Sequence, residues 1–511
     1  MTTPKIAMEG LSVRDVIDLR ANETPDREFL IDADTGDVVT FQAVQDAVRV
    51  VATRVAAHGV EPGQTVAYAM GNGTQTALTI LGLLYGGYHA TAINLAAGKE
   101  TIAYVLEHSE AQLVLTDVLS GALIDAAYQN RSSPPITITI DAAFFAGESI
   151  APKSSVTAAS DGLLMYTSGT TGRPKGVVLS HANLLAGGEN TCLAHALTSQ
   201  DRALCVLPLY HINGLCVTLL GPLVSGGCII MPPKFRVSQF WDLVKVHNAT
   251  WLSLVPTQIS YLIDDGKKNG AEKTAARFAR SASAPLSPDV QIVFEAMFGV
   301  PIVETMGLTE TAAPILSNPL PPGMRKIGSP GIPFGNEVVI ADPTGQEMSR
   351  GEEGEVLVRG PNVMREYLKN EKATQDTLTQ EGWLRTGDLG RMDADGYVFI
   401  TGRLKELVIK GGENIAPREI DDALYSHTDV IEAAAFAVSC PHYGEKIEAG
   451  VVLANGSALT EPALIAICIE KVGTFKAPDR VHVMSELPKG PSGKIQRIKL
   501  AELVIAQDSA A

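Results

Sequence analysis

Hydrophobic residues in the first 120 positions alternate between helical and extended spacing. Val44, Val48, Val51 and Val55 recur at steps of four, three and four residues, which marks one helix face, and Gly59 marks the end of that helix. Similar patterns predict, in chain order, a helix at 13–21, a strand at 65–70, a helix at 75–85, a strand at 89–93, a helix at 99–109 and a strand at 113–116. This alternation predicts βαβ units and a mostly parallel, doubly wound α/β sheet.

A second round of the same alternation lies between residues 203 and 255. Extended runs at 203–207, 228–231 and 250–255 are separated by helical patterns that begin at Gly214 and Ser238. Two similar α/β layers are therefore expected to share the N-terminal part of the chain.

From Gly328 to Ile400 the pattern changes to short β-prone runs between turn clusters. The runs are 337–340, 355–358 and 397–400, and their spacing predicts a small antiparallel β-barrel. One of the turn clusters, Asp393-Ala-Asp-Gly396, carries two carboxylates. Because Asp and Gly are favoured in turns, we interpret it as a β-turn and not as a metal site.

The pattern becomes a compact α+β arrangement beyond residue 405. Pro417 opens a helix, and strands are expected at 430–438 and 447–453. We therefore expect a large N-terminal domain at 1–404 and a smaller C-terminal domain at 405–511.

Composition and charge are those of a soluble globular protein. Of 511 residues, 45% are hydrophobic and 19% are charged, and the formal net charge is −16. Nucleic acids and anionic membranes both attract basic surfaces, so this acidic balance argues against either as a partner. Local cationic patches that receive anionic substrates remain compatible with it.

Cysteine usage predicts a reduced, cytoplasmic protein without a structural metal. The six cysteines form neither a CxxC pair nor a zinc-ligand pattern with histidine. The N-terminus lacks a signal-peptide pattern. The apolar run nearest to membrane-spanning length, 215–231, is interrupted by Pro222 and several glycines.

A loop at Tyr166–Gly176 carries the clearest chemical signal of the chain. It combines Ser and Thr hydroxyls and glycines with the cations Arg173 and Lys175, and it contains few residues suited to a core. Backbone N–H groups exposed by glycine, together with hydroxyls, can surround the oxygens of a polyphosphate. The loop is not a Walker motif, because Pro174 and Gly176 stand where that motif needs Gly and Ser or Thr. Since an apolar run precedes it and a helical pattern follows, we expect a phosphate site at the carboxyl end of a strand.

This loop resembles the AMP-binding signature of the acyl-adenylate-forming enzymes, a family that includes acyl-CoA synthetases, luciferases and the adenylation domains of peptide synthetases. Further segments match the family in the expected order, at 305–310, 383–388, 402–405, 410–415 and 488–494, so that the resemblance spans nearly the whole chain. It implies ATP, Mg²⁺ and CoA as ligands and a mobile C-terminal domain that changes position between two half-reactions.

The resemblance also implies roles for individual residues in the large domain. The residues implied to bind ATP and AMP are Thr167, Ser168, Gly169, Thr170, Thr171, Lys175, Met306, Asp388 and Arg403. Thr309 is implied as a phosphate contact and Glu310 as a Mg²⁺ ligand, because a hard cation bridging phosphates prefers carboxylate oxygen. Asp388 suits ribose binding, since a carboxylate accepts two hydrogen bonds at once. Met306 replaces the usual adenine-stacking Tyr, and its thioether can still pack on a purine.

Three features of the C-terminal domain carry implied roles. Lys494 is implied to bridge the attacking carboxylate and the α-phosphate, a step that joins two anions and needs cations where charge accumulates. Lys405 is implied as the hinge, and Gly411 and Gly412 as the lining of the thiol tunnel. A single lysine is by default a solvated surface residue, so these roles depend on the joint occurrence of the ordered segments.

Polar residues are implied along the pocket for the acid. The implied pocket residues are His211, Asn213, Ser281, Ser283 and Ala313. His211 is implied as a gate, although a single His is equally often structural. Serine hydroxyls would narrow the channel that fatty-acid enzymes open with glycine, and they offer donors to a polar substrate.

Among the branches of the family, the oxalate–CoA ligases are the most similar. Shared features are the segments 317–323, 325–326, 248–251 and 360–363. Ala313 stands where a pocket His is expected in that branch, which leaves room for a larger acid. We therefore expect a small polar or dianionic acid that is oxalate-like or slightly larger, such as a malonate-like or sulfoacetate-like acid.

Several other functions stay open at this level. They are an adenylation enzyme that loads a carrier protein, a CoA ligase for a short-chain, medium-chain or aromatic acid, a luciferase-type oxidative enzyme, and a nucleotide-binding pseudoenzyme. Joint retention of Glu310, Asp388, Arg403 and Lys494 argues against the last. Whether the protein is a monomer or a homodimer is not indicated.

Overall fold

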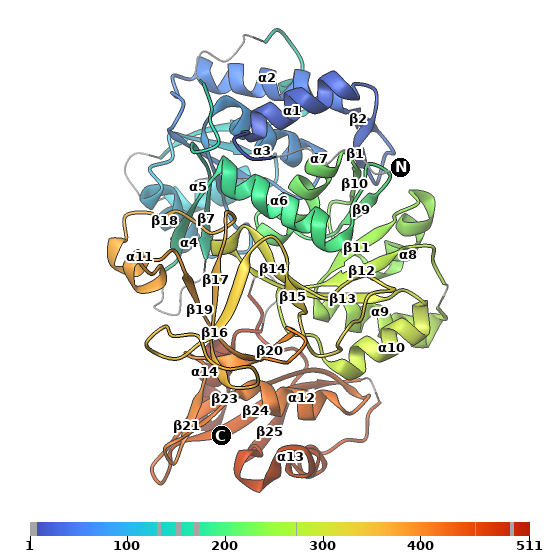
Figure 1. Ribbon diagram of the computed structural model, residues 1–511, viewed down its shortest axis with the longest axis vertical. Helices are drawn as coiled ribbons and strands as arrows, with labels where there is room; N and C mark the ends of the chain where they lie inside the picture. The colour runs from blue at the N-terminus through green and yellow to red at the C-terminus, as the bar shows by residue number, and fades with distance from the viewer. Residues whose placement is uncertain are drawn as a thin grey trace.

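The computed structural model describes residues 8–129, 134–149, 155–167, 173–271, 273–454, 456–490 and 495–510. Figure 1 shows a large N-terminal part, built from two sheets with covering helices, above a smaller C-terminal part that has a sheet of its own.

The first α/β layer is a seven-stranded sheet with the order β18-β8-β7-β4-β3-β5-β6. Its strands are β3 (Thr65–Ala69), β4 (His89–Ala92), β5 (Leu113–Thr116), β6 (Ile136–Thr139), β7 (Asp161–Thr167), β8 (Lys175–Ser180) and β18 (Glu366–Tyr367). Helices α3 (Thr74–Gly86), α4 (Lys99–His108) and α5 (Gly121–Tyr128) connect its parallel strands. The βαβ prediction for residues 65–116 is confirmed.

The second layer is a nine-stranded sheet with the order β15-β14-β13-β12-β11-β9-β10-β1-β2. Its strands are β1 (Glu28–Asp32), β2 (Val38–Thr40), β9 (Arg202–Cys205), β10 (Cys228–Met231), β11 (Trp251–Leu254), β12 (Phe278–Ser281), β13 (Ile302–Leu308), β14 (Ala313–Ser317) and β15 (Ile332–Pro333). Its helices are α6 (His181–His195), α7 (Gly221–Ser225), α8 (Val237–Val246), α9 (Pro256–Asn269) and α10 (Pro288–Phe298). The three strands predicted between residues 203 and 255 are present, and the prediction of two layers is confirmed.

The helices α1 (Val13–Glu23) and α2 (Phe41–Ala57) complete the N-terminal part. The predicted valine face of α2 is fully buried, and each such side chain contributes roughly 1.5–3 kcal/mol on burial. Helix α2 packs on α3 so closely that a Cβ atom on Gly82 would lie 2.5 Å from the Val51 Cβ. Only glycine permits this approach, which packs α2 directly against α3.

A third sheet follows in the chain and has the order β16-β17-β19-β20. Its strands are β16 (Glu337–Ala341), β17 (Glu353–Arg359), β19 (Leu384–Met392) and β20 (Val398–Arg403), and α11 (Glu371–Thr377) lies between the second and third of them. All three strand pairings are antiparallel, as predicted from the turn clusters. Strands β16 and β20 are the two ends of the strand order.

The C-terminal part contains a five-stranded sheet with its own hydrophobic core. Its elements are β21 (Val408–Lys410), β22 (Glu413–Ile415), α12 (Pro417–Tyr425), β23 (Val430–Cys440), β24 (Gly444–Leu453), α13 (Glu461–Lys476), β25 (Arg480–Val483) and α14 (Arg497–Ala510). Side chains join it to the large part. The Tyr261 hydroxyl donates to the Glu432 carboxylate at 3.2 Å, and Lys489 contacts both residues.

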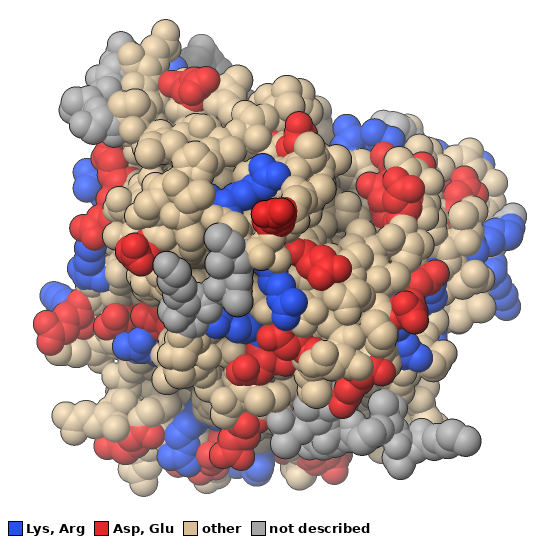
Figure 2. Space-filling model, turned by 90° about the horizontal axis from the view of Figure 1, so that it is seen from above, with Lys and Arg blue, Asp and Glu red and all other residues tan. Residues whose placement is uncertain are grey.

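Surface charge is mixed on the face seen in Figure 2, where acidic and basic side chains are interspersed. Within the described part of the chain, no helix combines the length and the apolarity needed to cross a bilayer.

Candidate active site

The predicted phosphate loop connects two neighbouring antiparallel strands of the first sheet, β7 and β8. Strand β7 ends at Thr167 and β8 begins at Lys175, and these two residues are opposite each other in the pairing. Residues 168–172, which include Ser168, Gly169, Thr170 and Thr171, lie outside the described part of the chain. The Lys175 ammonium lies 4.5 Å from the centroid of the Tyr367 ring, a cation–π contact that positions the cation at the base of the loop.

The candidate Mg²⁺ ligand lies beside this cation. Thr309 and Glu310 form a short 3₁₀ turn, Thr309–Thr311, directly after β13. The Tyr367 hydroxyl donates to Glu310 Oε1 at 2.8 Å, and the Met364 N–H donates to the Glu310 carbonyl at 2.8 Å. Burial first, and then the Glu310 charge, raise the pKa of Tyr367 far above its usual value, so the phenol remains a donor. Lys175, Tyr367 and Glu310 therefore form one contiguous group.

The residues implied to bind ribose lie on adjacent strands of the third sheet. Asp388 on β19 and Arg403 on β20 are opposite each other, and Arg403 Nε donates to Asp388 Oδ1 at 2.5 Å. The Asp388 charge is the main reason why the pKa of Arg403 is raised, and the Glu310 charge contributes in the same direction. The structure thus brings Asp388, Arg403 and Glu310 within electrostatic range of one another.

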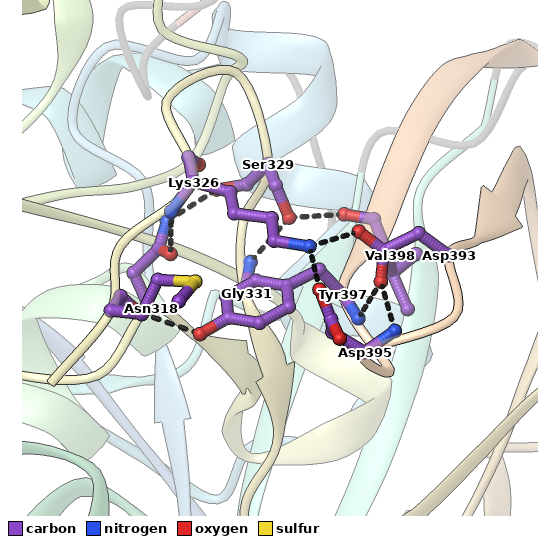
Figure 3. Close-up of polar contacts among 9 residues, drawn as sticks. Asn318, Lys326, Ser329, Gly331, Asp393, Asp395, Tyr397 and Val398 are labelled. Atoms are coloured by element: carbon purple, nitrogen blue, oxygen red, sulfur yellow. Dashed lines mark hydrogen bonds and ion pairs between the residues drawn. The ribbon is translucent and has the colours of Figure 1, made fainter.

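A polar network holds the hairpin that carries Asp388 and Arg403 (Figure 3). Lys326 Nζ contacts both Asp393 Oδ2 and Asp395 Oδ2 at 2.6 Å and lies over the Tyr397 ring. The Ser329 hydroxyl donates to the Val398 carbonyl at 2.5 Å. The Asp393 carboxylate also accepts the N–H groups of Asp395 and Tyr397, as in an Asx-turn. The β-turn interpretation of this segment is confirmed, and the network ties the hairpin to the loop before β15.

Met306 lies on β13, four residues before Glu310. It is half-buried and packs against the main hydrophobic core, opposite Leu316 on β14. A thioether at this position is compatible with contact to a purine face.

Only some of the residues implied for the acid pocket contact one another. Asn213 Nδ2 donates to Ser283 Oγ at 3.0 Å. Ser281 is fully buried, and its Oγ has no hydrogen-bond partner among the described residues. His211 packs edge-on against Tyr210 with ring centroids 4.7 Å apart. Ala313 pairs through its backbone with Leu308, and its side chain lies outside the description.

The helix predicted from Gly214 is a π-helix, Asn213–Leu220, followed by α7. Its start lies so close to the preceding loop that a Cβ on Gly214 would be 2.3 Å from the Pro208 carbonyl oxygen. In a π-helix each backbone hydrogen bond spans five residues instead of the four of an α-helix, which widens the helix. Such helices are often found at functional sites. Here it places Asn213 beside the serines.

One buried residue of this region escaped prediction from the sequence. Arg280 on β12 is 2% exposed, and its Nη1 donates to Asn213 Oδ1 at 2.5 Å. A cation inside the short apolar run 278–281, directly before two serines, is the signal that could have found it.

The residues with implied roles in the C-terminal domain are Lys405, Gly411, Gly412 and Lys494. Lys405 lies between the last strand of the third sheet and the first strand of the C-terminal sheet. Gly411 and Gly412 form the tip of the β21–β22 hairpin, and their φ angles of 61° and 88° explain why glycine is needed there. Lys494 lies outside the described residues.

Cysteines and acidic clusters give no sign of a second metal site or a disulfide in the described part of the chain. All six cysteines are free, and the described part of the chain contains no group of three or more His, Cys, Asp or Glu side chains suited to a metal. A single carboxylate such as Glu310 fits Mg²⁺, which is commonly held by one or two carboxylates together with substrate phosphates.

Glu304, two residues before Met306, gives the first testable prediction. It is 3% exposed, its Oε2 has no hydrogen-bond partner among the described residues, and burial raises its pKa to about 7. As pH rises from 4.5 to 7, the unfolded chain releases this proton before the folded chain does, so stability falls by about 3 kcal/mol and then stays level. Glu304→Gln should remove this loss.

We expect Glu304→Gln to raise the apparent Tm at pH 8 and to change it little at pH 4.5. Thermal unfolding at both pH values measures the difference, and Glu347→Gln, at an exposed position, is the control. An equal effect of Glu304→Gln at the two pH values would contradict the assignment.

Comparison with known proteins gives a consistent assignment. The model of the AMP-binding enzyme family matches residues 17–368, and that of the AMP-binding enzyme C-terminal domain matches residues 419–494. The chain is 44% identical over 499 residues to a protein of Cupriavidus necator named sulfoacetate–CoA ligase, covering 95% of this chain and 96% of that protein. It is 34% identical over 510 residues to the oxalate–CoA ligase of Arabidopsis thaliana, covering 97% and 99%.

A solved structure shows the same fold. ATP-bound MatB from Rhodopseudomonas palustris matches with a TM-score of 0.87 at 29% identity, covering 96% of this chain and 99% of that chain. The region matched by the AMP-binding model, residues 17–368, includes the candidate nucleotide-site residues Thr167, Lys175, Glu310 and Tyr367. The resemblance inferred from the phosphate loop is confirmed, and this chain belongs to the AMP-binding enzyme family.

Proposed function

We propose that the protein is an ATP-dependent acid–CoA ligase that activates a small dianionic carboxylic acid. The observation that supports this proposal is that Tyr367 contacts both Lys175 and Glu310, while Asp388 pairs with an Arg403 that is within electrostatic range of Glu310. This group offers a cation and a metal-binding carboxylate for phosphates, and a carboxylate for a ribose.

The reaction follows from the poor reactivity of a carboxylate as an acyl donor. Attack of the acid carboxylate on the ATP α-phosphorus breaks the bond to pyrophosphate and forms an acyl-adenylate, whose leaving group is AMP. The two reactants are both anionic, so fixed cations at the reacting phosphate lower the barrier. We assign this role to Lys494, with Lys175 on the phosphates that leave.

Glu310 would hold Mg²⁺ against the departing phosphates. The metal's contribution there is to offset their negative charge. Tyr367 fixes the Glu310 carboxylate by its hydrogen bond. Asp388 would accept hydrogen bonds from the two ribose hydroxyl groups, and its contact with Arg403 orients its carboxylate.

A second step would transfer the acyl group to the CoA thiol. We assign Lys405 as the hinge of the C-terminal domain, the boundary between domains to that position, and Gly411 with Gly412 to the thiol tunnel. The hinge lies in the short connection between Arg403 and Val408, where the third sheet ends and the C-terminal sheet begins. A short connection between two sheets is a suitable place for the φ/ψ change of a rotation.

The acid class is supported by two observations. The protein with 44% identity is named for sulfoacetate and another relative for oxalate, and each of these acids carries two anionic groups. The implied pocket contains the hydroxyls of Ser281 and Ser283 and the Asn213 amide, which suit a polar acid better than an alkyl chain.

CoA-dependent release of AMP tests this proposal. Purified protein with MgATP and CoA is given sulfoacetate, malonate, oxalate, acetate and octanoate in parallel. We expect AMP release only when both acid and CoA are present, and faster with a dianionic acid than with octanoate. Acid-dependent adenylate formation without turnover by free CoA would favour a carrier protein as acceptor, and a preference for octanoate would contradict the acid class.

A further inference from the structure

Arg280 is a buried cation without an anionic partner. Its side chain is 2% exposed, and no Asp or Glu of the described chain lies within ion-pair distance. Nη1 donates to Asn213 Oδ1 at 2.5 Å and lies 3.5 Å from Ser253 Oγ, whereas Nε has no hydrogen-bond partner among the described residues.

Such an arrangement costs stability. Burying a guanidinium without a carboxylate is unfavourable, and burial lowers the pKa of Arg280 to about 9, which still leaves it protonated at neutral pH. An apolar residue would fill this place in β12 at lower cost, as Ala279 does next to it. The cost therefore points to a role for the charge.

The donor pattern of Arg280 fixes the orientation of its neighbour. A guanidinium only donates hydrogen bonds, so Asn213 must present Oδ1 to it and keep Nδ2 for Ser283. Ser283 Oγ then accepts from Asn213, and its own O–H proton remains available to a third group. Ser283 makes this contact from a left-handed backbone conformation, with φ 74°.

Ser281 is a second serine of this segment. Ser281 Oγ is fully buried and has no partner among the described residues. The Ser283 hydroxyl, linked through Asn213 to an uncompensated positive charge, is suited to donate to a carboxylate or sulfonate. Ser281 follows Arg280 directly in β12 and therefore points to the other face of the sheet.

We propose that Arg280 is a positioning residue for acid selection: through Asn213 it turns the Ser283 hydroxyl into a donor toward the second anionic group of the acid, and its charge favours that group over a neutral one. This inference rests on the proposed ligase function. It does not require Arg280 to touch the substrate.

Asn213→Asp separates this role from a structural one. The aspartate has the same shape and supplies the missing partner for Arg280, so the fold should keep its Tm. An aspartate cannot donate a hydrogen bond to Ser283, so the Ser283 hydroxyl would instead donate to the aspartate. The added negative charge also offsets the positive charge of Arg280. We expect KM for sulfoacetate to rise by about 10- to 100-fold, the range typical of a lost charge-assisted hydrogen bond, with KM for ATP unchanged.

Arg280→Met provides the second variant, and Arg277→Met is its matched control. Arg277 directly precedes the same strand, and it forms an ion pair with Asp201 instead of contacting Asn213. The readout is the ratio of kcat/KM for sulfoacetate to that for acetate, together with the same ratio for malonate. Both Asn213→Asp and Arg280→Met should lower these ratios by at least about tenfold, whereas Arg277→Met should leave them unchanged.

The outcomes separate the two proposals. Equal losses with acetate and with the dianions, or a lower Tm without a change in the ratios, would overturn the role of Arg280. A wild-type enzyme that turns over acetate as well as the dianions would also overturn it while leaving the ligase function standing. Absence of AMP release with every acid would overturn the ligase function itself and the inference with it.

Discussion

Lys494→Ala should slow acyl-adenylate formation by about 10²–10³-fold or more, the usual loss when one charge contact in the transition state is deleted. The acid carboxylate and the α-phosphate repel each other, and we assign Lys494 as the cation between them. ATP–pyrophosphate exchange measures this half-reaction. Lys499 is an exposed residue of α14 that closely follows Lys494 in the sequence. The control Lys499→Ala removes one positive charge, as Lys494→Ala does, and should retain full exchange.

The second half-reaction distinguishes this role from general damage. Thioester formation from supplied acyl-adenylate and CoA should survive in Lys494→Ala, because the domain rotation we propose moves this lysine away before the thiol attacks. If thioester formation falls as far as adenylate formation, the role assigned to Lys494 is wrong.

Glu310→Gln should lower adenylate formation by a similar factor, about 10²–10³-fold, and shift its dependence on Mg²⁺ to higher concentration. The amide keeps the shape and can still accept from Tyr367, but it loses the charge that a hard cation prefers. Pyrophosphate exchange over a range of Mg²⁺ concentrations measures both effects.

Tyr367→Phe is the matched control for Glu310. It removes only the 2.8 Å hydrogen bond to Glu310 and keeps the ring beneath Lys175. We expect a loss of about tenfold or less, since one hydrogen bond to a charged group is at stake. An unchanged Mg²⁺ dependence in Glu310→Gln would rule out Glu310 as the ligand.

Local pattern predicts much of this fold because many elements have strong periodicity. The α2 valine face and the strands at 65–69 and 113–116 follow directly from spacing. The hairpin β1–β2 does not, because it pairs with β10, which lies about 200 residues later in the chain. Local hydrophobic spacing carries no information on such a distant partner.

The candidate site divides along the same line. Glu310, Asp388 and Lys175 lie in motifs that resemble those of the family, and their residue types suit phosphate and ribose chemistry, so the resemblance indicates them. Arg280 is noticeable in the sequence as a cation within an apolar run, but neither its role nor that of Glu304 could be predicted, because strand spacing does not tell which face is buried or what it contacts. Only the folded chain shows that both are enclosed without an opposite charge at hydrogen-bonding distance.

Acid-dependent exchange of labelled pyrophosphate into ATP, in the absence of CoA, tests the formation of an acyl-adenylate most directly. With MgATP and a panel of dianionic and monoanionic acids, we predict exchange that requires the acid and is greatest with a small dianion such as sulfoacetate. Folded protein that shows no exchange with any acid of the panel would contradict the proposed chemistry.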